Sequence, residues 1–381
     1  MFKKILIANR GEIAVRIIRA CKEWGISTVA IHSDVDRDSM HVRLADESIC
    51  VGPHQPTFSY LNIPAIMSAI ELTNSEAVHP GYGFLSENAE FAKILEDNNI
   101  KFIGPSSSLI SKMGDKIQAK KIAKQYGLPV IEGSEGGVSD IKEAKKLSKN
   151  IGFPILIKAA GGGGGKGMKI VEEESKLNEM YSLARLEAKK YFGNDEVYIE
   201  KYFKNPRHIE VQVLSGKNRT VHLNERDCSV QRKHQKLIEE TPSPFLDQRA
   251  FRDLRKKMSK AAVRLAETAG YTNAGTVEFV VDEKGKFYFL EMNKRIQVEH
   301  PVTEEVTGVD LVQQQILIAM GEPLRISQGD IKQIGHSVEC RINAEDPFGD
   351  FRPSPGRIDM LFAPGGRGVR WDSHVYAGYT I

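Results

Sequence analysis

Short apolar runs alternate with amphipathic stretches through the first third of the chain. Residues 4–8 (KILIA) predict a buried strand, residues 11–24 an amphipathic helix, and residues 28–32 a second strand. A strand–helix–strand unit of this length predicts two parallel strands joined by a right-handed crossover. Further strand, helix and strand segments follow at 77–80, 87–98 and 101–105. The pattern therefore predicts a parallel α/β domain over residues 1–113.

The pattern changes beyond this domain. A basic helical stretch at 114–127 leads to a Gly- and Ser-rich break at 133–139, which predicts a linker. From residue 153 the order is strand, glycine loop, strand, and strands and helices are expected to alternate to about residue 330. The last stretch, 336–381, is strand-like and rich in Gly and Pro. The expected fold therefore combines α/β and α+β parts.

The composition limits the class of protein. Of 381 residues, 53 are basic and 50 acidic, and a formal net charge of +3 predicts no nucleic-acid partner. No apolar run approaches the ~18 residues of a membrane span, and the first apolar stretch is too short for a signal peptide. The four cysteines form no CxxC pair, which favours a reducing compartment over a structural zinc site. A cytoplasmic enzyme without a membrane partner is expected.

A first glycine signal follows the first predicted strand, at residues 9–14 (NRGEIA). A dinucleotide-binding turn needs three glycines in the pattern GxGxxG, and only Gly11 is present. A helix start packed on a sheet explains this segment better than an NAD site does.

The loop at 161–167 (GGGGGKG) is more informative. Ordering so many glycines costs backbone entropy, but it lets successive N–H groups approach an anion. Lys166 in the loop and Lys158 before it add positive charge. Ala160 and Gly167 stand where a Walker A loop needs Gly and Ser or Thr. We interpret the loop as a mobile flap over phosphates, with a flexible linker as the alternative.

Two strand patterns flank a turn at 282–285. A tight hairpin centred on Lys284-Gly285 would place Glu278 opposite Glu291, with their Cβ atoms roughly 5 Å apart. Two carboxylates so close repel each other unless a divalent cation bridges them, and oxygen ligands favour magnesium or manganese. The hairpin therefore predicts a metal site, unless one glutamate points into solvent.

Alternation continues beyond this hairpin. An extended chain would place five hydrogen-bonding side chains on one face, namely Glu291, Asn293, Arg295, Gln297 and Glu299. Lys294 breaks the apolar parity of the other face, so the extended geometry is expected to end near it. A polar face that holds an arginine and a carboxylate beside a metal pair indicates a reaction cleft.

The segment 226–236 carries four cations and a histidine. Alone, such a run is typical of a solvated basic turn, and it becomes an anion site only together with the features above. Cys228 lies within it without an evident base partner, so a thiol nucleophile is not expected.

The chain as a whole resembles the biotin carboxylases, which are ATP-grasp enzymes. The resemblance runs from residue 4 to the last residue and rests on eight ordered motifs: IANRGEIAVRIIRAC, HPGYGFLSEN, MGDK, GGGGGKGM, EKYFKNPRHIEVQV, ERDCSVQRKHQK, EMNKRIQVEHPVTE and VECRINAEDP. It implies an ATP-grasp domain over 114–330 with a glycine-rich lid at about 132–203, and a partial C-terminal domain over 331–381. The family normally continues several dozen residues past the point where this chain stops.

The resemblance also implies residue roles. The residues that would contact the phosphates of ATP are Lys116, Lys158, Gly164, Gly165 and Lys166. The residues that would contact the adenine are Glu200, Lys201, Tyr202 and Phe203. The nucleotide site would also be lined by His208, Gln231 and His234. Those for magnesium (or manganese) are Glu278, Glu291 and Asn293. Those for bicarbonate are Lys236, Arg295, Gln297 and Val298, with Glu299 as general base, and Arg341 would face the ureido oxygen of biotin.

The implied reaction has two parts. Glu299 would deprotonate bicarbonate, which Arg295 and Lys236 hold against the γ-phosphate of ATP. Carboxyphosphate would then release CO2 in a closed site, where biotin is carboxylated. The chain lacks the AMKM-type biotin-bearing motif, so biotin is expected on a separate biotin carboxyl carrier protein.

The QRKHQK form is most similar to the separate subunit of bacterial acetyl-CoA carboxylase, which serves fatty-acid synthesis. That likeness implies a homodimer that works with carboxyltransferase subunits. Three alternatives stay open: a subunit of a propionyl-CoA or pyruvate carboxylase, an ATP-grasp ligase that joins a carboxylate to an amine, and a catalytically silent truncated subunit.

Overall fold

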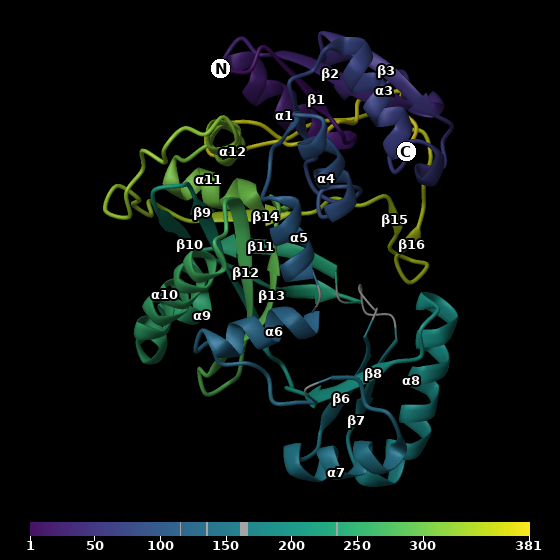
Figure 1. Cartoon of the computed structure of the whole chain (residues 1–381), viewed down its shortest axis with the longest axis vertical. Coiled ribbons are helices and arrows are strands. Elements are labelled where there is room, and N and C mark those ends of the chain that lie inside the picture. The colour runs from purple at the N-terminus through teal and green to yellow at the C-terminus, as the bar shows by residue number, and fades with distance from the viewer. Residues whose placement is uncertain (115, 135, 161–166, 234) are drawn as a thin grey trace.

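The computed structural model describes residues 1–114, 116–134, 136–160, 167–233 and 235–381. Figure 1 shows three parts stacked along the long axis: an N-terminal sheet, a central sheet, and a small sheet flanked by α7 and α8. The expected combination of a parallel α/β N-terminal part with mixed helices and strands beyond it is confirmed.

The N-terminal sheet has five parallel strands in the order β3-β2-β1-β4-β5. Its strands are β1 Lys4–Ile7, β2 Ser27–Ser33, β3 Glu47–Gly52, β4 Ala77–His79 and β5 Lys101–Phe102. Its helical segments are α1 Gly11–Glu23, η1 Asp34–Asp36, α2 Met40–Leu44, η2 Pro56–Phe58, α3 Ile63–Thr73, α4 Ala89–Asp97 and α5 Ser107–Gly114. Ile5 packs into one apolar core with α1, and Leu6 into another with α3 and α4. Helices on both faces explain why the strands read as short apolar runs.

The small sheet at the far end is antiparallel, with strand order β7-β6-β8. Its elements are α7 Ile141–Ile151, β6 Ile155–Ala159, β7 Met168–Val171, η3 Glu174–Lys176, α8 Leu177–Phe192 and β8 Val197–Lys201. Helix α6, Lys116–Gln125, connects it to the N-terminal domain and lies near β13. The expected linker at 133–139 pairs with β8 instead, through Ser134 N–H to Ile199 O at 2.8 Å.

The central sheet has six antiparallel strands in the order β13-β12-β9-β10-β11-β14. Its strands are β9 Arg207–Ser215, β10 Thr220–Arg232, β11 Gln235–Thr241, β12 Asn273–Val281, β13 Phe287–Asn293 and β14 Ser337–Cys340. Its helices are α9 Pro244–Asp247, η4 Arg249–Phe251, α10 Arg252–Ala269, α11 His300–Thr307 and α12 Leu311–Ala319. The expected strand–helix alternation is wrong between β8 and β11, because antiparallel neighbours need only short turns and no crossover helix.

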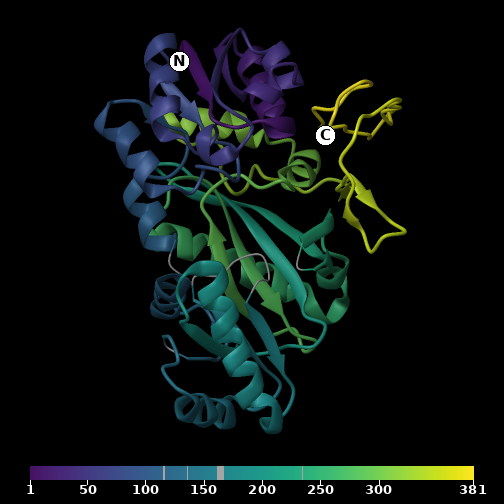
Figure 2. The ribbon, with the colours of Figure 1, turned by 90° about the vertical axis from the view of Figure 1, so that its right-hand side faces the viewer.

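The residues after β14 form little regular structure apart from the pair β15 Glu345–Asp346 and β16 Arg352–Pro353. This segment stands off from the main body in Figure 2. It returns to the N-terminal domain, where the Tyr376 hydroxyl donates to Asp38 O at 2.7 Å. Several of its large apolar side chains are exposed, among them Phe348 and Phe362.

Candidate active site

One face of the central sheet is polar although it is buried. Alternation along β9 and β12 brings His208, Glu210, Gln212, Thr276 and Glu278 to this face. The residues between them belong to the apolar core that α10 covers on the opposite face. A sheet face with buried charges needs an internal partner for each of them.

Arg226 on β10 is the centre of the hydrogen bonds on this face. Its side chain is fully buried. It donates to Glu210 Oε1 (2.6 Å), Gln212 Oε1 (2.7 Å), Thr303 Oγ1 (3.0 Å), Thr276 Oγ1 (3.1 Å) and Gln297 Oε1 (2.7 Å). Arg226 therefore fixes β9, β12, α11 and the turn before α11 relative to one another.

Lys236 on β11 lies among three carboxylates. Its Nζ is 2.5 Å from Glu210, 3.0 Å from Glu278 and 2.7 Å from Glu299. Burial opposes the charged form, but the carboxylates outweigh burial and raise the pKa of Lys236 well above its usual range. Burial would also raise the pKa of Glu210, yet Lys236 and Arg226 lower it to about 2. Both groups are therefore charged at neutral pH.

The predicted hairpin is confirmed: Glu278 pairs with Glu291 in the ladder between β12 and β13. Glu278 accepts hydrogen bonds from Lys236, His208 (2.7 Å), Asn293 (2.6 Å) and Gln297 (2.8 Å). Burial would raise the pKa of Glu278, but Lys236 and His208 outweigh burial and hold it well below its usual range. An ionised carboxylate opposite a second one supplies the hard oxygen donors that Mg²⁺ prefers, so this pair fits the implied metal.

Other combinations of ligand atoms also lie close together on this face. His208, Glu210 and Glu278 form one such group, and Glu210, Cys228 and Glu299 form another. The oxygen of Asn293 accepts from Arg295 Nη2 at 3.0 Å, so this third predicted ligand is engaged elsewhere in the present arrangement. Burial raises the pKa of the Cys228 thiol well above its usual range, in agreement with the expectation that it is no nucleophile.

Glu299 stands at the N-terminus of α11, where two cations hold its carboxylate. Oε1 accepts from Lys236 at 2.7 Å, and Oε2 accepts from Arg341 Nη2 at 3.0 Å. Arg341 follows β14 directly, and its backbone N–H donates to Leu237 O on β11 at 3.0 Å. Sequence-distant residues thus meet because β14 adds to the edge of the central sheet.

The extended geometry ends near Lys294, as expected, since β13 stops at Asn293. The prediction that alternation continues to Glu299 is wrong: residues 294–299 form a bend and a turn. Glu87 of the N-terminal domain holds this bend, because its carboxylate accepts from the Lys294 backbone N–H (3.0 Å) and from Arg295 Nε (3.1 Å). It also forms an ion pair with Lys294 Nζ at 3.0 Å. Val298 is half-buried in the turn.

A second cluster of charges lies between α6 and the small sheet. Lys158 on β6 and Lys120 on α6 both pair with the buried Glu200 carboxylate, the latter at 2.6 Å. Lys120 Nζ is also 5.2 Å from the centre of the Tyr198 ring. Burial would raise the pKa of Glu200, but Lys158 and Lys120 outweigh burial and lower it.

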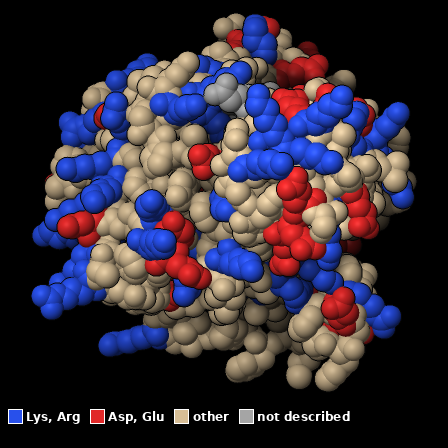
Figure 3. Space-filling view, turned by 90° about the horizontal axis from the view of Figure 1, so that it is seen from below, with Lys and Arg blue, Asp and Glu red and all other residues tan. Residues whose placement is uncertain are grey.

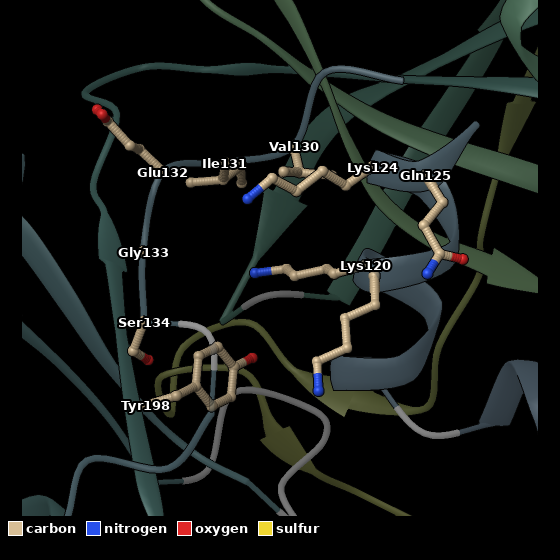
Figure 4. Close-up of a pocket in the computed structure, with 10 residues that line it drawn as sticks. Lys120, Lys124, Gln125, Val130, Ile131, Glu132, Gly133, Ser134 and Tyr198 are labelled. Carbon is tan, nitrogen blue, oxygen red and sulfur yellow. The ribbon is translucent and has the colours of Figure 1, made fainter. Parts of the chain in front are cut away.

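A cavity of about 480 Å³ opens beside this cluster. Lysines of α6, including Lys120 and Lys124, face Tyr198 and the 130–134 segment across it (Figure 4). Seen from below, the surface carries both Lys or Arg and Asp or Glu side chains, with those of opposite charge often side by side (Figure 3).

The remaining predicted adenine contacts lie where β8 leaves the small sheet. Lys201 Nζ donates to the backbone oxygens of Gly152 (2.9 Å) and Phe153 (3.2 Å), and Tyr202 N–H donates to Pro154 O (3.1 Å). The Phe203 ring stacks on Tyr288 with 5.0 Å between centroids. Gln231 Nε2 lies 3.0 Å from His208 Nδ1, which joins two other predicted residues.

Five predicted positions cannot be placed. Gly164, Gly165, Lys166 and His234 lie outside the described residues, as does the side chain of Lys116. The flap and its phosphate contacts therefore stay predictions.

Sequence reasoning missed several residues of this site. Glu210 and Gln212 could have been found, because polar residues alternate with Ile209, Val211 and Val213 along EKYFKNPRHIEVQV. Other missed residues reach the site from distant segments with no local pattern: Glu87, Lys120 and Glu239.

Comparisons with known proteins agree with this arrangement. Residues 1–110 match the family described as biotin carboxylase, N-terminal domain, residues 115–327 the carbamoyl-phosphate synthase L chain ATP binding domain, and residues 339–381 the biotin carboxylase C-terminal domain. A biotin carboxylase of Haemophilus influenzae is 56% identical over 383 residues, which cover 100% of this chain and 84% of that protein.

Solved structures give the same result. A biotin carboxylase–beta-gamma-ATP complex from Campylobacter jejuni has a TM-score of 0.95 at 49% identity and covers 100% of this chain and 84% of its own. The biotin carboxylase domain dimer of Hydrogenobacter thermophilus 2-oxoglutarate carboxylase, in complex with MgADP, ADP and bicarbonate, has a TM-score of 0.95 at 50% identity, with coverage of 100% and 83%. These family matches and relatives show that the chain belongs to the biotin carboxylase family.

Proposed function

We propose that this protein is an ATP-dependent ligase that activates bicarbonate and carboxylates biotin on a separate carrier protein. The observation that carries the proposal is the carboxylate of Glu299 between Lys236 and Arg341, beside the ionised Glu278. A base flanked by cations suits a reaction in which an anion must lose a proton and then attack a phosphate.

Bicarbonate would lie next to Glu299, which takes its proton. Lys236 is the nearest cation to Glu299 and would share its charge with the dianion, with Arg295 and Gln297 as further donors. The backbone at Val298 would complete the site. Since bicarbonate is a weak nucleophile until it is deprotonated, these residues make it reactive and orient it.

ATP and Mg²⁺ are the expected nucleotide and metal. Glu278 and Glu291, with Asn293, would hold the metal, which offsets charge on the phosphate oxygens during transfer. Lys158 would move from Glu200 to a phosphate, while Lys120 keeps Glu200 paired. Manganese has the same ligand preference and would serve as a substitute.

Biotin would enter next to Arg341, where carboxyphosphate would break down to CO2 and phosphate. This phosphate would take the proton from the ureido nitrogen of biotin, which then attacks CO2. The ureido nitrogen becomes nucleophilic when negative charge moves to the ureido oxygen, and a guanidinium near that oxygen stabilises the charge. The Arg341 side chain is 24% exposed, so a ligand can reach it.

Several finer assignments belong to the same proposal. We propose three domains over 1–113, 114–330 and 331–381, a homodimer, carboxyltransferase partners, and acetyl-CoA as the acceptor that serves fatty-acid synthesis. The relatives include biotin carboxylases and the biotin carboxylase domain of a 2-oxoglutarate carboxylase, and we propose that partner subunits choose the acceptor. The four free cysteines support a cytoplasmic location. A separate finding is that none of the described helices combines the length and the apolar character of a membrane span.

The test is ADP release by the purified chain with and without bicarbonate and free biotin. The proposal expects slow release that requires bicarbonate and accelerates with biotin. Release that ignores bicarbonate would favour a ligase for another carboxylate, and no release at all would favour a silent subunit.

A further inference from the structure

Glu239 on β11 is a fully buried carboxylate that no predicted role includes. Its Oε1 accepts from Arg341 Nε at 2.7 Å and contacts Arg341 Nη2 at 2.5 Å. Its Oε2 is buried and accepts no hydrogen bond from any described residue. Burial raises the pKa of Glu239, although Arg341 opposes this rise. A buried carboxyl with one partner is costly, so its presence is best explained by what it does to Arg341.

Arg341 is held asymmetrically. The edge formed by Nε and Nη2 faces Glu239, and Nη2 also donates to Glu299 at 3.0 Å. Within the described part of the chain, Nη1 has no hydrogen-bond partner in the protein. The guanidinium is therefore anchored along one edge and leaves donors for an incoming acceptor on the other.

Glu299 and Glu239 differ in what the reaction asks of them. Under the proposed function, Glu299 takes a proton from bicarbonate, and a protonated carboxyl is a weaker partner for Arg341. At that moment Nη2 can turn from Glu299 to another acceptor, whereas Glu239 still holds Nε. An arginine without this second partner would lose its orientation when Glu299 changes charge.

From this geometry we infer that Glu239 is a positioning residue that keeps Arg341 aimed at the ureido oxygen of biotin while Glu299 changes its protonation state. The inference rests on the proposed function and adds a residue that acts only through Arg341. It predicts that Glu239 is needed for the carboxylation of biotin and not for bicarbonate-dependent cleavage of ATP.

Glu339 provides a matched control. It stands opposite Glu239 in the ladder between β11 and β14, and among the described residues Arg341 donates to Glu239 and Glu299 but not to Glu339. Burial, followed by Glu239 and Glu299, raises the pKa of Glu339 to about 8, so it is largely neutral at pH 7. Glu339→Gln replaces a neutral acid by a neutral amide of the same shape, whereas Glu239→Gln removes the charge that holds Arg341.

The experiment measures ADP and carboxybiotin on the same samples for the unaltered chain, Glu239→Gln, Glu239→Asp and Glu339→Gln. We expect Glu239→Gln to keep bicarbonate-dependent ADP release without biotin, to form about tenfold less carboxybiotin per ADP, and to need more biotin for half-saturation. Glu239→Asp, which keeps the charge, should fall between Glu239→Gln and the unaltered chain. Glu339→Gln should match the unaltered chain.

An unchanged ratio of carboxybiotin to ADP in Glu239→Gln would overturn the inference. If both products then fall in parallel and the melting temperature is lower, Glu239 is merely structural. If Glu239→Gln does not fold, the ratio in Glu239→Asp decides. An unaltered chain without bicarbonate-dependent ADP release is a different result, since it refutes the proposed function itself.

Discussion

The parallel N-terminal sheet and the antiparallel central sheet bury their strands in different ways. Ile5 and Leu6 of β1 enter apolar cores on opposite faces of the first sheet. In the central sheet, Ile209 enters an apolar core while Glu210 enters a network of buried charges with Arg226 and Lys236. The first sheet is stabilised by apolar burial on both faces, and the second combines a stabilising face with a face that is costly to bury and suited to chemistry.

This difference explains why the candidate active site forms on the central sheet. Charges in a water-poor face interact strongly and stay oriented, so they can act on substrates without large rearrangement. The N-terminal sheet contributes through its loops, since Glu87 reaches Lys294 and Arg295 from outside the sheet.

The substitution that we expect to change the protein most is at Arg226, the centre of the hydrogen bonds on the polar face. Arg226→Met removes a cation that pairs with the buried Glu210 carboxylate. We therefore expect the free energy of unfolding to fall by about 3 kcal/mol, and we expect each folded molecule to lose its activity. Leu6→Ala in the parallel sheet should cost about 2–5 kcal/mol and leave activity per folded molecule unchanged. Urea unfolding and turnover corrected for folded fraction measure both. Equal effects of the two variants on corrected turnover would contradict the comparison.

A smaller effect concerns the metal pair. Glu278→Gln and Glu291→Gln each remove one hard oxygen charge, and we expect the magnesium needed for half-maximal turnover to rise about tenfold or more. Titration of turnover against magnesium tests this. Unchanged magnesium dependence in both variants would remove the metal from this hairpin.

The smallest effect concerns pH. Burial would raise the pKa of Asp36 beside the parallel sheet, but hydrogen bonds from Arg10 and Tyr60 lower it to about 2. The stability that Asp36 contributes is therefore complete above pH 4 and is lost as pH falls toward 2.

Glu339 in the central sheet behaves oppositely, because its pKa rises from 4.5 to about 8. The folded state keeps a proton that the unfolded state releases, so stability falls as pH rises from 4.5 to 8. Glu339→Gln should reduce this fall by about 1 kcal/mol, less than the full shift because the group is partly exposed. Unfolding curves at pH 5 and pH 8 measure it, and identical pH dependence with and without Glu339 would refute the assignment.

The sequence predicted the parallel sheet and the Glu278–Glu291 hairpin because both follow from local patterns: apolar runs with helices between them, and equal distances from one turn. It did not predict the meander β9–β11, since short strands joined by turns look similar to strand–helix units in an apolar pattern.

The residues of the candidate active site also differ in whether a local sequence pattern predicts them. Positions 291 and 293 followed from alternation, whereas the approach of Arg341 to Glu299 depends on β14 joining the edge of the sheet. Contacts of Glu239, Lys120 and Glu87 join segments distant in sequence, and no local period encodes them.

We propose that the charged face of the antiparallel sheet carries two reaction steps: Glu299 acts on bicarbonate, and Arg341 acts on biotin. The most direct measurement follows ADP and carboxybiotin together in Glu299→Gln and Arg341→Ser. We predict that Glu299→Gln loses both products, while Arg341→Ser keeps bicarbonate-dependent ADP release and loses carboxybiotin by a factor that corresponds to roughly 3–4 kcal/mol. A parallel loss of both products in Arg341→Ser, with a lower melting temperature, would contradict the account and leave Arg341 as a structural partner of Glu239 and Glu299.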